Sequence, residues 1–189
     1  MGLNVDLAQK EKRTMKENVV GKILFTEEQI KKRAEEIGRQ IREDYKEEPV
    51  YLICTLRGAV VWMADIMKSI TNDTEIDFIA ASSYGSGTTT SGIVKITKDL
   101  DGDIYNKNVI IIEDIVDTGT TLKFLKERLA DRNPKSIRIC TLLDKPSRRL
   151  ADIKADYIGF SIDNLFVIGY GLDYDQKYRN LPYVSYLEG

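Results

Sequence analysis

The spacing of apolar residues along the chain predicts an amphipathic helix over residues 27–45. Its aliphatic residues recur every three or four positions, as on one face of a helix: Ile30, Ala34, Ile37 and Ile41. Just before this run, Thr26 and Gln29 have the spacing of a capping box, in which two side chains satisfy free backbone N–H groups. The sequence therefore predicts both where this helix begins and which face it buries.

Short apolar runs rich in β-branched residues predict a series of strands. They cover residues 50–55, 75–82, 92–97, 109–114, 136–143, 157–161 and 166–170. Apolar stripes after Gly58 and after Thr121 predict two further helices. This alternation indicates an α/β protein with a mostly parallel central sheet and helices on both faces. We expect a single domain over residues 1–189, in which the charged, aperiodic residues 1–18 form a mobile tail.

The segment from Val109 to Thr121 has the composition of a ligand site. Its apolar strand ends at two adjacent acids, Glu113 and Asp114, and a short loop and a predicted helix follow. Ligands of open α/β sheets bind beyond the carboxyl ends of the strands. The acids suit sugar hydroxyls or a magnesium ion, and a helix N-terminus rich in Gly and Thr offers N–H groups to a phosphate. A phosphorylated sugar is therefore the predicted ligand.

This segment closely resembles the signature of the type I phosphoribosyltransferases, which bind phosphoribosyl pyrophosphate. The resemblance extends over about residues 20–184 and implies the fold of that family, with a small hood subdomain beside the main sheet. It implies that Glu113 and Asp114 orient the ribose hydroxyls. It also implies that the loop and helix start hold the rest of the phosphoribosyl group, through Asp117, Thr118, Gly119, Thr120 and Thr121.

The loop after strand 50–55 matches the pyrophosphate-binding loop of the family. It carries Arg57 and Gly58, and the resemblance implies a cis peptide bond between Leu56 and Arg57. A guanidinium suits phosphate oxygens because its planar fork donates two parallel hydrogen bonds. Arg179 matches a further family residue near the pyrophosphate.

Magnesium is the cofactor that the resemblance implies. Asp173 matches a residue that helps to hold this ion with the pyrophosphate, and Glu113 and Asp114 are the other predicted ligands. Carboxylates are the hard oxygen ligands that magnesium prefers.

Three residues further along the chain resemble the base site of the hypoxanthine-guanine branch of the family. Lys145 matches the lysine that reads the exocyclic oxygen of a 6-oxopurine, Phe166 matches the residue that stacks on the purine, and Val167 offers backbone groups to the base edge. A buried donor at this place rejects adenine, because the adenine amino group would leave the ammonium unpaired.

Two predictions concern the chemistry itself. The loop over residues 82–92 is rich in Gly, Ser and Thr, and its Ser83 and Tyr84 match a lid that excludes water from the activated ribose. Asp117 is a carboxylate in the phosphate loop that is able to accept a proton from the purine, as a general base.

The composition excludes or disfavours several other classes of protein. The chain has 189 residues with a formal net charge of -2, which argues against a nucleic-acid-binding protein, since these usually carry a basic excess. No apolar stretch is long enough to span a membrane. The chain has no histidine, which excludes a Ser-His-Asp triad, and Cys54 and Cys140 lie in apolar runs typical of buried free thiols. A cytoplasmic location is expected.

The implied reaction is the magnesium-dependent transfer of a phosphoribosyl group to hypoxanthine or guanine, which gives IMP or GMP and pyrophosphate. The choice between these two bases stays open. One alternative keeps the enzyme class and changes the base to xanthine, uracil or orotate. Another is a regulator that kept the fold without catalysis. Family members are commonly dimers or tetramers, so a homodimer or homotetramer is expected.

Overall fold

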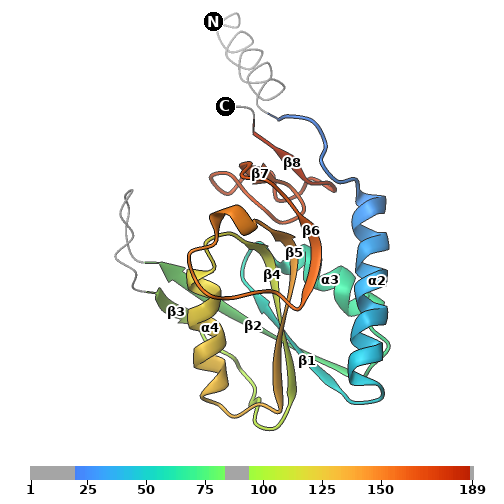
Figure 1. Cartoon of the computed structure of the whole chain (residues 1–189), viewed down its shortest axis with the longest axis vertical. Coiled ribbons are helices and arrows are strands. Elements are labelled where there is room, and N and C mark those ends of the chain that lie inside the picture. The colour runs from blue at the N-terminus through green and yellow to red at the C-terminus, as the bar shows by residue number, and fades with distance from the viewer. Residues whose placement is uncertain (1–19, 84–93, 188–189) are drawn as a thin grey trace, which may run out of the picture.

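The structure is a computed structural model that describes residues 20–83 and 94–187. Its centre is a six-stranded sheet in the order β3-β2-β1-β4-β5-β6 (Figure 1). The strands are β1 (Val50–Thr55), β2 (Thr74–Ser83), β3 (Val94–Lys98), β4 (Asn108–Val116), β5 (Ser136–Asp144) and β6 (Tyr157–Ser161). Neighbouring strands are parallel, except that β3 pairs antiparallel with β2. The predicted mostly parallel sheet is therefore confirmed.

Helices cover both faces of this sheet, as predicted. Those in the described residues are α2 (Glu27–Tyr45), α3 (Val60–Ser69) and α4 (Thr120–Ala130). Helices α2 and α3 pack on one face and α4 packs on the other (Figure 1). Strand β4 is buried on both sides, because Ile110 and Ile112 face α2 and α3 while Val109 and Ile111 face α4. This two-sided burial explains its unbroken apolar run.

The start of α2 agrees with the predicted capping box. The N–H of Gln29 donates to Thr26 Oγ1 at 3.3 Å, and the N–H of Thr26 donates to Gln29 Oε1 at 2.8 Å. The four aliphatic residues of the predicted stripe are all buried. The helix therefore begins where its local sequence satisfies the first free N–H groups.

A second, two-stranded sheet forms the hood, which lies at the end of the main sheet where the parallel strands terminate (Figure 1). It consists of β7 (Val167–Ile168) and β8 (Ser185–Tyr186). Strand β7 is shorter than the predicted strand over 166–170, because the backbone turns to positive φ at Gly169, Tyr170 and Gly171. The sequence did not predict β8 or a short 3₁₀ helix over Pro146–Arg148.

Both cysteines are buried free thiols, as expected. Cys54 on β1 and Cys140 on β5 each pair in register with Ile112, so the width of β4 separates them. Within residues 20–83 and 94–187, none of the helices is long and apolar enough to cross a membrane.

Asp77 ties the loop after β3 to the sheet. Its side chain is 4% exposed, and its Oδ2 accepts hydrogen bonds from the Tyr51 hydroxyl (2.9 Å) and the N–H groups of Asp101 (2.9 Å) and Gly102 (3.0 Å). Burial alone would raise the pKa of Asp77, but the surrounding donors hold this pKa below its usual value. The carboxylate is thus stabilised in its charged form.

We predict that Asp77→Ala lowers the free energy of unfolding by on the order of 3 kcal/mol, because it leaves several buried donors without an acceptor. The pKa of Asp77 is lower in the folded protein than in the unfolded chain. The carboxylate therefore contributes its full stabilisation above the unfolded-state pKa of about 4, and this stabilisation is lost as the pH falls through the folded-state pKa. Urea unfolding at pH 7 and at pH 3 measures both effects. The exposed Asp103→Ala is the control, and equal losses in the two variants would contradict the assigned role.

Candidate active site

Two adjacent carboxylates lie near the carboxyl end of β4, which runs two residues further than predicted. Glu113 pairs with the hydroxyl of Thr55 on the neighbouring strand β1, and this hydroxyl also contacts the carbonyl of Ile112 at 2.9 Å. Asp114 Oδ1 accepts the N–H of Ile115 at 2.8 Å. Burial raises the pKa of both carboxyls, that of Glu113 with a further contribution from the adjacent Asp114 charge and that of Asp114 to about 6.

Gly58 packs directly against this acidic pair. A Cβ at this position would overlap Asp114 Oδ2, so any other residue would displace the carboxylate. The peptide bond between Leu56 and Arg57, just before it, is cis, as the family resemblance implied. The loop between β1 and α3 therefore closes one side of the acidic pair.

The turn after β4 leads into the N-terminus of α4. Gly119 occupies the capping position at φ +79°, and no side chain caps the helix. The first turn of α4 carries no acidic residue, so its free N–H groups and the positive end of the helix dipole remain available to an anion. Asp117 pairs with Arg148 Nε at 3.1 Å, and both side chains are exposed.

A cavity of about 220 Å³ joins the acidic pair to Thr121, at the end of this turn, and to the hood. The other predicted phosphoribosyl residues do not line it: Asp117, Thr118, Gly119 and Thr120. Most of the predicted phosphoribosyl, pyrophosphate and metal residues line it: Arg57, Gly58, Glu113, Asp114, Thr121, Asp173 and Arg179. Thr55, Leu56, Ala81 and Leu125 also line this cavity and were not predicted. Residues more than a hundred positions apart in the sequence therefore meet at one hollow.

The hood contributes a connected set of polar side chains to the cavity. Arg179 donates to Asp173 Oδ1 at 2.8 Å, to the carbonyl of Gly171 at 2.8 Å and to Gln176 Oε1 at 3.0 Å. Arg57 reaches the same Gln176 oxygen at 3.4 Å. This network places two guanidinium groups and one carboxylate beside the acidic pair.

The predicted metal ligands do not form a closed metal site. Within the part of the chain that the structure describes, no group of three or more His, Cys, Asp or Glu residues is arranged to hold a metal ion. Glu113, Asp114 and Asp173 line one cavity without forming such a cluster, and their role as magnesium ligands stays a prediction. Magnesium commonly binds through one or two carboxylates together with water and substrate phosphates. The donor chemistry therefore fits an ion that arrives with a phosphorylated ligand.

The predicted base residues lie outside the residues that line this cavity. Lys145 directly follows β5, its side chain is 6% exposed, and burial lowers the pKa of its ammonium group. Its backbone N–H donates to the carbonyl of Val116 at 3.0 Å, which joins it to the start of the turn after β4. Phe166 is 54% exposed and makes an edge-to-face contact with Tyr174, while Val167 is buried in β7. An exposed aromatic face is available for stacking.

The predicted lid and tail lie largely outside the described residues. Tyr84 and residues 84–93 are not described, and Ser83 is described only as the last residue of β2. Residues 1–19, which include the predicted mobile tail, are also outside the described ranges.

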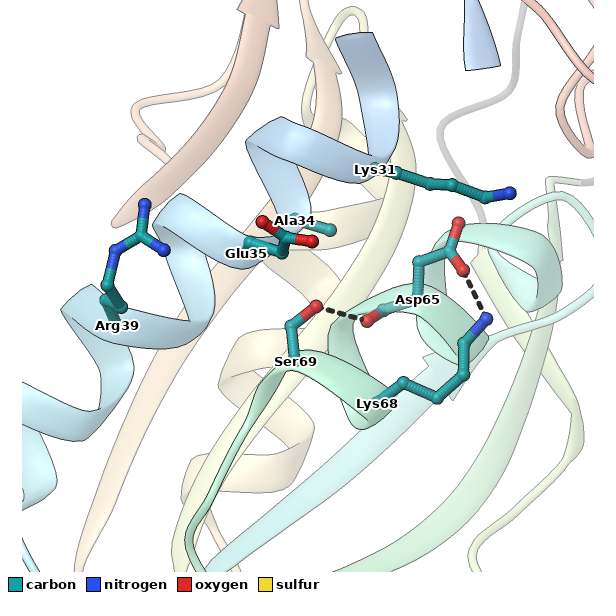
Figure 2. Close-up of a pocket in the computed structure, with 7 residues that line it drawn as sticks. All are labelled: Lys31, Ala34, Glu35, Arg39, Asp65, Lys68 and Ser69. Carbon is teal, nitrogen blue, oxygen red and sulfur yellow. Dashed lines mark hydrogen bonds and ion pairs between the residues drawn. The ribbon is translucent and has the colours of Figure 1, made fainter. Parts of the chain in front are cut away.

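A larger hollow of about 420 Å³ lies between α2 and α3 (Figure 2). Its acidic and basic groups partly neutralise each other, since Lys68 pairs with Asp65 at 2.6 Å. The other residues that line it are Lys31, Ala34, Glu35, Arg39 and Ser69. None of the predicted site residues is among them, so the smaller cavity at the strand ends is the candidate active site.

Sequence reasoning missed several residues that hold the site together. Thr55 pairs with Glu113, Arg148 pairs with Asp117, and Tyr174 supports Phe166. Arg148 lay three residues after the predicted base lysine, so its position was a usable signal. Thr55 had no comparable signal, because its partner lies 58 residues away in the sequence.

Comparisons with known proteins show the family of this chain. The family model of the phosphoribosyl transferase domain matches residues 21–175. The hypoxanthine-guanine phosphoribosyltransferase of Streptococcus thermophilus is 48% identical over 174 residues, which cover 92% of this chain and 97% of that protein. The hypoxanthine phosphoribosyltransferase of Salmonella typhimurium is 52% identical over 165 residues, which cover 86% of this chain and 93% of that protein.

A crystal structure of a hypoxanthine phosphoribosyltransferase from Staphylococcus aureus has a TM-score of 0.88 to this chain at 47% sequence identity. The match covers 93% of this chain and 95% of that one. The chain belongs to the phosphoribosyltransferase family. Within the family its relatives are the hypoxanthine and hypoxanthine-guanine phosphoribosyltransferases, so both the family and the branch indicated by the sequence are confirmed.

We predict that Asp114→Asn stabilises the ligand-free protein at pH 8. The folded-state pKa of Asp114 is raised to about 6 from an ordinary 3.8, so ionisation at pH 8 costs folding free energy that the amide does not. The expected rise in melting temperature is about 2–6 °C. Near pH 5 the difference should shrink, because the wild-type carboxyl then carries its proton.

Thermal unfolding followed by circular dichroism across this pH range measures the effect. Asp163→Asn, which changes an exposed carboxylate, is the matched control and should change little. If Asp114→Asn melted at a lower temperature than the wild-type protein at pH 8, ionisation of Asp114 would not destabilise the folded protein.

Proposed function

We propose that this protein is a purine-salvage enzyme that transfers the phosphoribosyl group of phosphoribosyl pyrophosphate to hypoxanthine or guanine, with magnesium as cofactor. The products are IMP or GMP and pyrophosphate. One observation carries this proposal: the partly buried acidic pair Glu113 and Asp114 shares a cavity with Arg57 and Arg179 beside the N-terminus of α4, which no side chain caps. Carboxylates for a diol, cations for a diphosphate and N–H groups for a phosphate are the groups that this substrate needs. The names of the relatives support the choice of base.

The acidic pair would hold the ribose. Glu113 and Asp114 accept hydrogen bonds from the two ring hydroxyls, and their negative charge favours positive character at the anomeric carbon. Because burial raises both pKa values, bound hydroxyl donors or a cation would stabilise charged forms that are disfavoured in the empty cavity. Substrate binding would thus offset part of the free-energy cost of ionising these two carboxyl groups.

The turn from Asp117 to Thr121 would hold the 5′-phosphate. The N–H groups of the turn and of the first residues of α4 donate to the phosphate oxygens, and the helix dipole adds roughly half a positive charge. Gly119 supplies the left-handed backbone that this turn requires.

The pyrophosphate would lie on the hood side of the cavity. Arg57 and Arg179 bind its oxygens, and Asp173 with the acidic pair would hold magnesium, which supplies charge neutralisation to the departing group when bound. Asp173 keeps Arg179 in place through their 2.8 Å ion pair. The two guanidinium groups therefore stabilise the negative charge that grows as the bond to the ribose breaks.

The purine would lie between the end of β5 and the hood. Lys145 donates a hydrogen bond to the 6-oxygen, Phe166 stacks on the ring and the backbone of Val167 meets the base edge. Burial lowers the pKa of Lys145, so this ammonium gains more from an acceptor than a solvated one would.

Asp117 would act as general base and accept a proton from the imidazole ring of the purine. Its partner Arg148 is exposed, and exposed ion pairs contribute only about 0–1 kcal/mol. The pair therefore opens at little cost when the base arrives. Ser83 and Tyr84 would close over the reactants as a lid and exclude water.

Two alternatives predict different results. A xanthine-preferring enzyme would use the same phosphoribosyl groups and differ only around Lys145 and Phe166. A regulator without catalysis would bind phosphoribosyl pyrophosphate and form no nucleotide. The retained acidic pair and Asp117 favour an enzyme, because a protein that only senses the ligand has no need of a general base.

We further propose that the enzyme works in the cytoplasm as one domain per chain, in a homodimer or homotetramer. The net charge of -2 and the small-molecule site favour neither a nucleic acid nor a membrane as partner. Light scattering of the purified protein measures the oligomeric state.

The deciding experiment incubates the purified protein with phosphoribosyl pyrophosphate, magnesium and one of hypoxanthine, guanine, xanthine or adenine. Nucleotide formation with the first two bases supports the proposal. Turnover of xanthine alone supports the first alternative. Binding of phosphoribosyl pyrophosphate without any product supports the second.

We predict that Lys145→Ala reduces the selectivity for 6-oxopurines over adenine by at least about tenfold, because the buried donor that rejects the adenine amino group is gone. Competition assays with hypoxanthine and adenine measure the ratio of kcat/KM values. Lys154→Ala, which removes an exposed lysine of the following loop, is the control. Unchanged selectivity in Lys145→Ala would mean that another group reads the base.

We predict that Asp117→Asn lowers kcat by about 10²–10⁴-fold, the usual contribution of a general base, while the affinity for GMP changes little. Steady-state kinetics and calorimetric titration with GMP separate the two effects. Turnover at the wild-type rate would remove Asp117 from the mechanism.

A further inference from the structure

Arg149 is a partly buried arginine that none of the proposed substrate-binding roles uses. It lies directly after the 3₁₀ helix, and its side chain is 16% exposed. The guanidinium donates to the carbonyls of Asp117 through Nε (3.1 Å), Val116 through Nη2 (3.2 Å) and Ile153 through Nη1 (2.7 Å). Nη2 also pairs with the carboxylate of Asp144. One planar group thus meets four acceptors.

Three of these acceptors come from two separate parts of the proposed site, and the fourth, the Ile153 carbonyl, belongs to the loop that carries Arg149. Val116 is the last residue of β4 and Asp117 opens the phosphate turn, whereas Asp144 is the last residue of β5 and directly precedes Lys145. The Val116 carbonyl also accepts the backbone N–H of Lys145 at 3.0 Å. Arg149 therefore joins the ends of two neighbouring strands at the point where one leads to the phosphate turn and the other to the base lysine.

The loop that carries Arg149 also supports the phosphate turn from behind. The N–H groups of Leu150 and Ala151 both donate to the carbonyl of Thr118 at 3.0 Å. A Cβ on Gly119 would lie 2.6 Å from Ile153 Cγ2 and 3.0 Å from Arg149 Cδ, so the turn rests closely on this loop. The carbonyls of three successive residues, Val116 at the end of β4 and Asp117 and Thr118 in the turn, are thereby bound to the loop. A carbonyl held in this way does not turn its negative end toward an anion at the start of α4.

We propose that Arg149 is a positioning residue that sets the phosphate turn in register with Lys145. The inference rests on the proposed function, in which a purine nucleotide spans both places, with its 5′-phosphate on the turn and its 6-oxygen at Lys145. The planar guanidinium group of arginine suits this role, because its rigid N–H groups fix the spacing between the carbonyls and the carboxylate that it bridges. Lysine cannot replace it, since a single ammonium lacks the planar fork.

Arg33 provides a matched control for a purely structural effect. It too is a partly buried arginine that donates to backbone carbonyls, through Nη2 to Ile158 at 2.7 Å and through Nε to Gly159 at 3.0 Å, and it pairs with Glu36 at 2.8 Å. It joins α2 to β6 and lines neither the candidate active site nor the phosphate turn. Loss of either arginine should therefore cost stability, but only Arg149 should affect ligand binding.

The test compares Arg149→Lys and Arg33→Lys with the wild-type protein. Melting temperatures report stability, and calorimetric titrations in the presence of magnesium report the Kd values for GMP and for pyrophosphate. We expect both variants to melt at a lower temperature. Only Arg149→Lys should raise the Kd for GMP, by about tenfold or more. The Kd for pyrophosphate should stay within about twofold, because that ligand uses neither the turn nor Lys145.

A second variant covers the case in which Arg149→Lys does not fold. Asp144→Asn keeps the shape of the side chain and weakens the ion pair with Arg149, so it should raise the Kd for GMP in the same direction by a smaller factor. Hydrogen exchange should also quicken at the amides of Leu150 and Ala151 in both variants, since these bond to the turn.

The outcomes separate the two proposals. An unchanged Kd for GMP in both Arg149→Lys and Asp144→Asn would overturn the positioning role, as would an equal loss of affinity for GMP in Arg33→Lys. If the wild-type protein bound neither GMP nor pyrophosphate, the proposed function itself would fail, and this inference with it.

Discussion

The structure depends on two carboxyl groups that lie side by side and partly buried near the end of one strand. Burial of Glu113 and Asp114 raises both pKa values, so the folded chain keeps these carboxylates at a cost in free energy. Strand β4 offsets this cost because its apolar residues are buried on both faces of the sheet. Gly58 leaves room for the Asp114 carboxylate, and Thr55 donates to Glu113. The carboxyl groups therefore lie where burial disfavours their charge, near the end of a strand whose apolar residues are buried on both faces.

The parallel arrangement of the sheet then decides what surrounds this pair. Strands β1, β4 and β5 run in the same direction and are neighbours, so the loops that follow them meet at one edge. The hood lies at the same edge (Figure 1). Its Asp173 and Arg179, from the far end of the chain, line the cavity with the acidic pair. Carboxylates, guanidinium groups and the first turn of a helix are thus brought together at one cavity. Arg149 then links two of these loops directly.

Most regular elements could be predicted from the sequence, with ends that differ by one or two residues. The capping box fixed the start of α2, because its hydrogen bonds join residues only three positions apart. Strand β8 and the 3₁₀ helix were missed, since elements of two or three residues carry no measurable periodicity. Strand β7 was predicted too long, because three successive positive φ angles ended an apolar run that looked continuous.

The sequence by itself determined the fold class, the acidic pair and the turn after it, because these depend on short-range patterns and on a signature within one segment. Only the tertiary structure decided which side chains support them. Thr55 reaches Glu113 across 58 residues, and Arg149 reaches the carbonyl of Asp117 across 32. Such contacts depend on how the chain crosses from strand to strand and on the direction of each side chain. The local spacing of residues does not predict such contacts, because the free energy that favours them comes from packing of the whole domain.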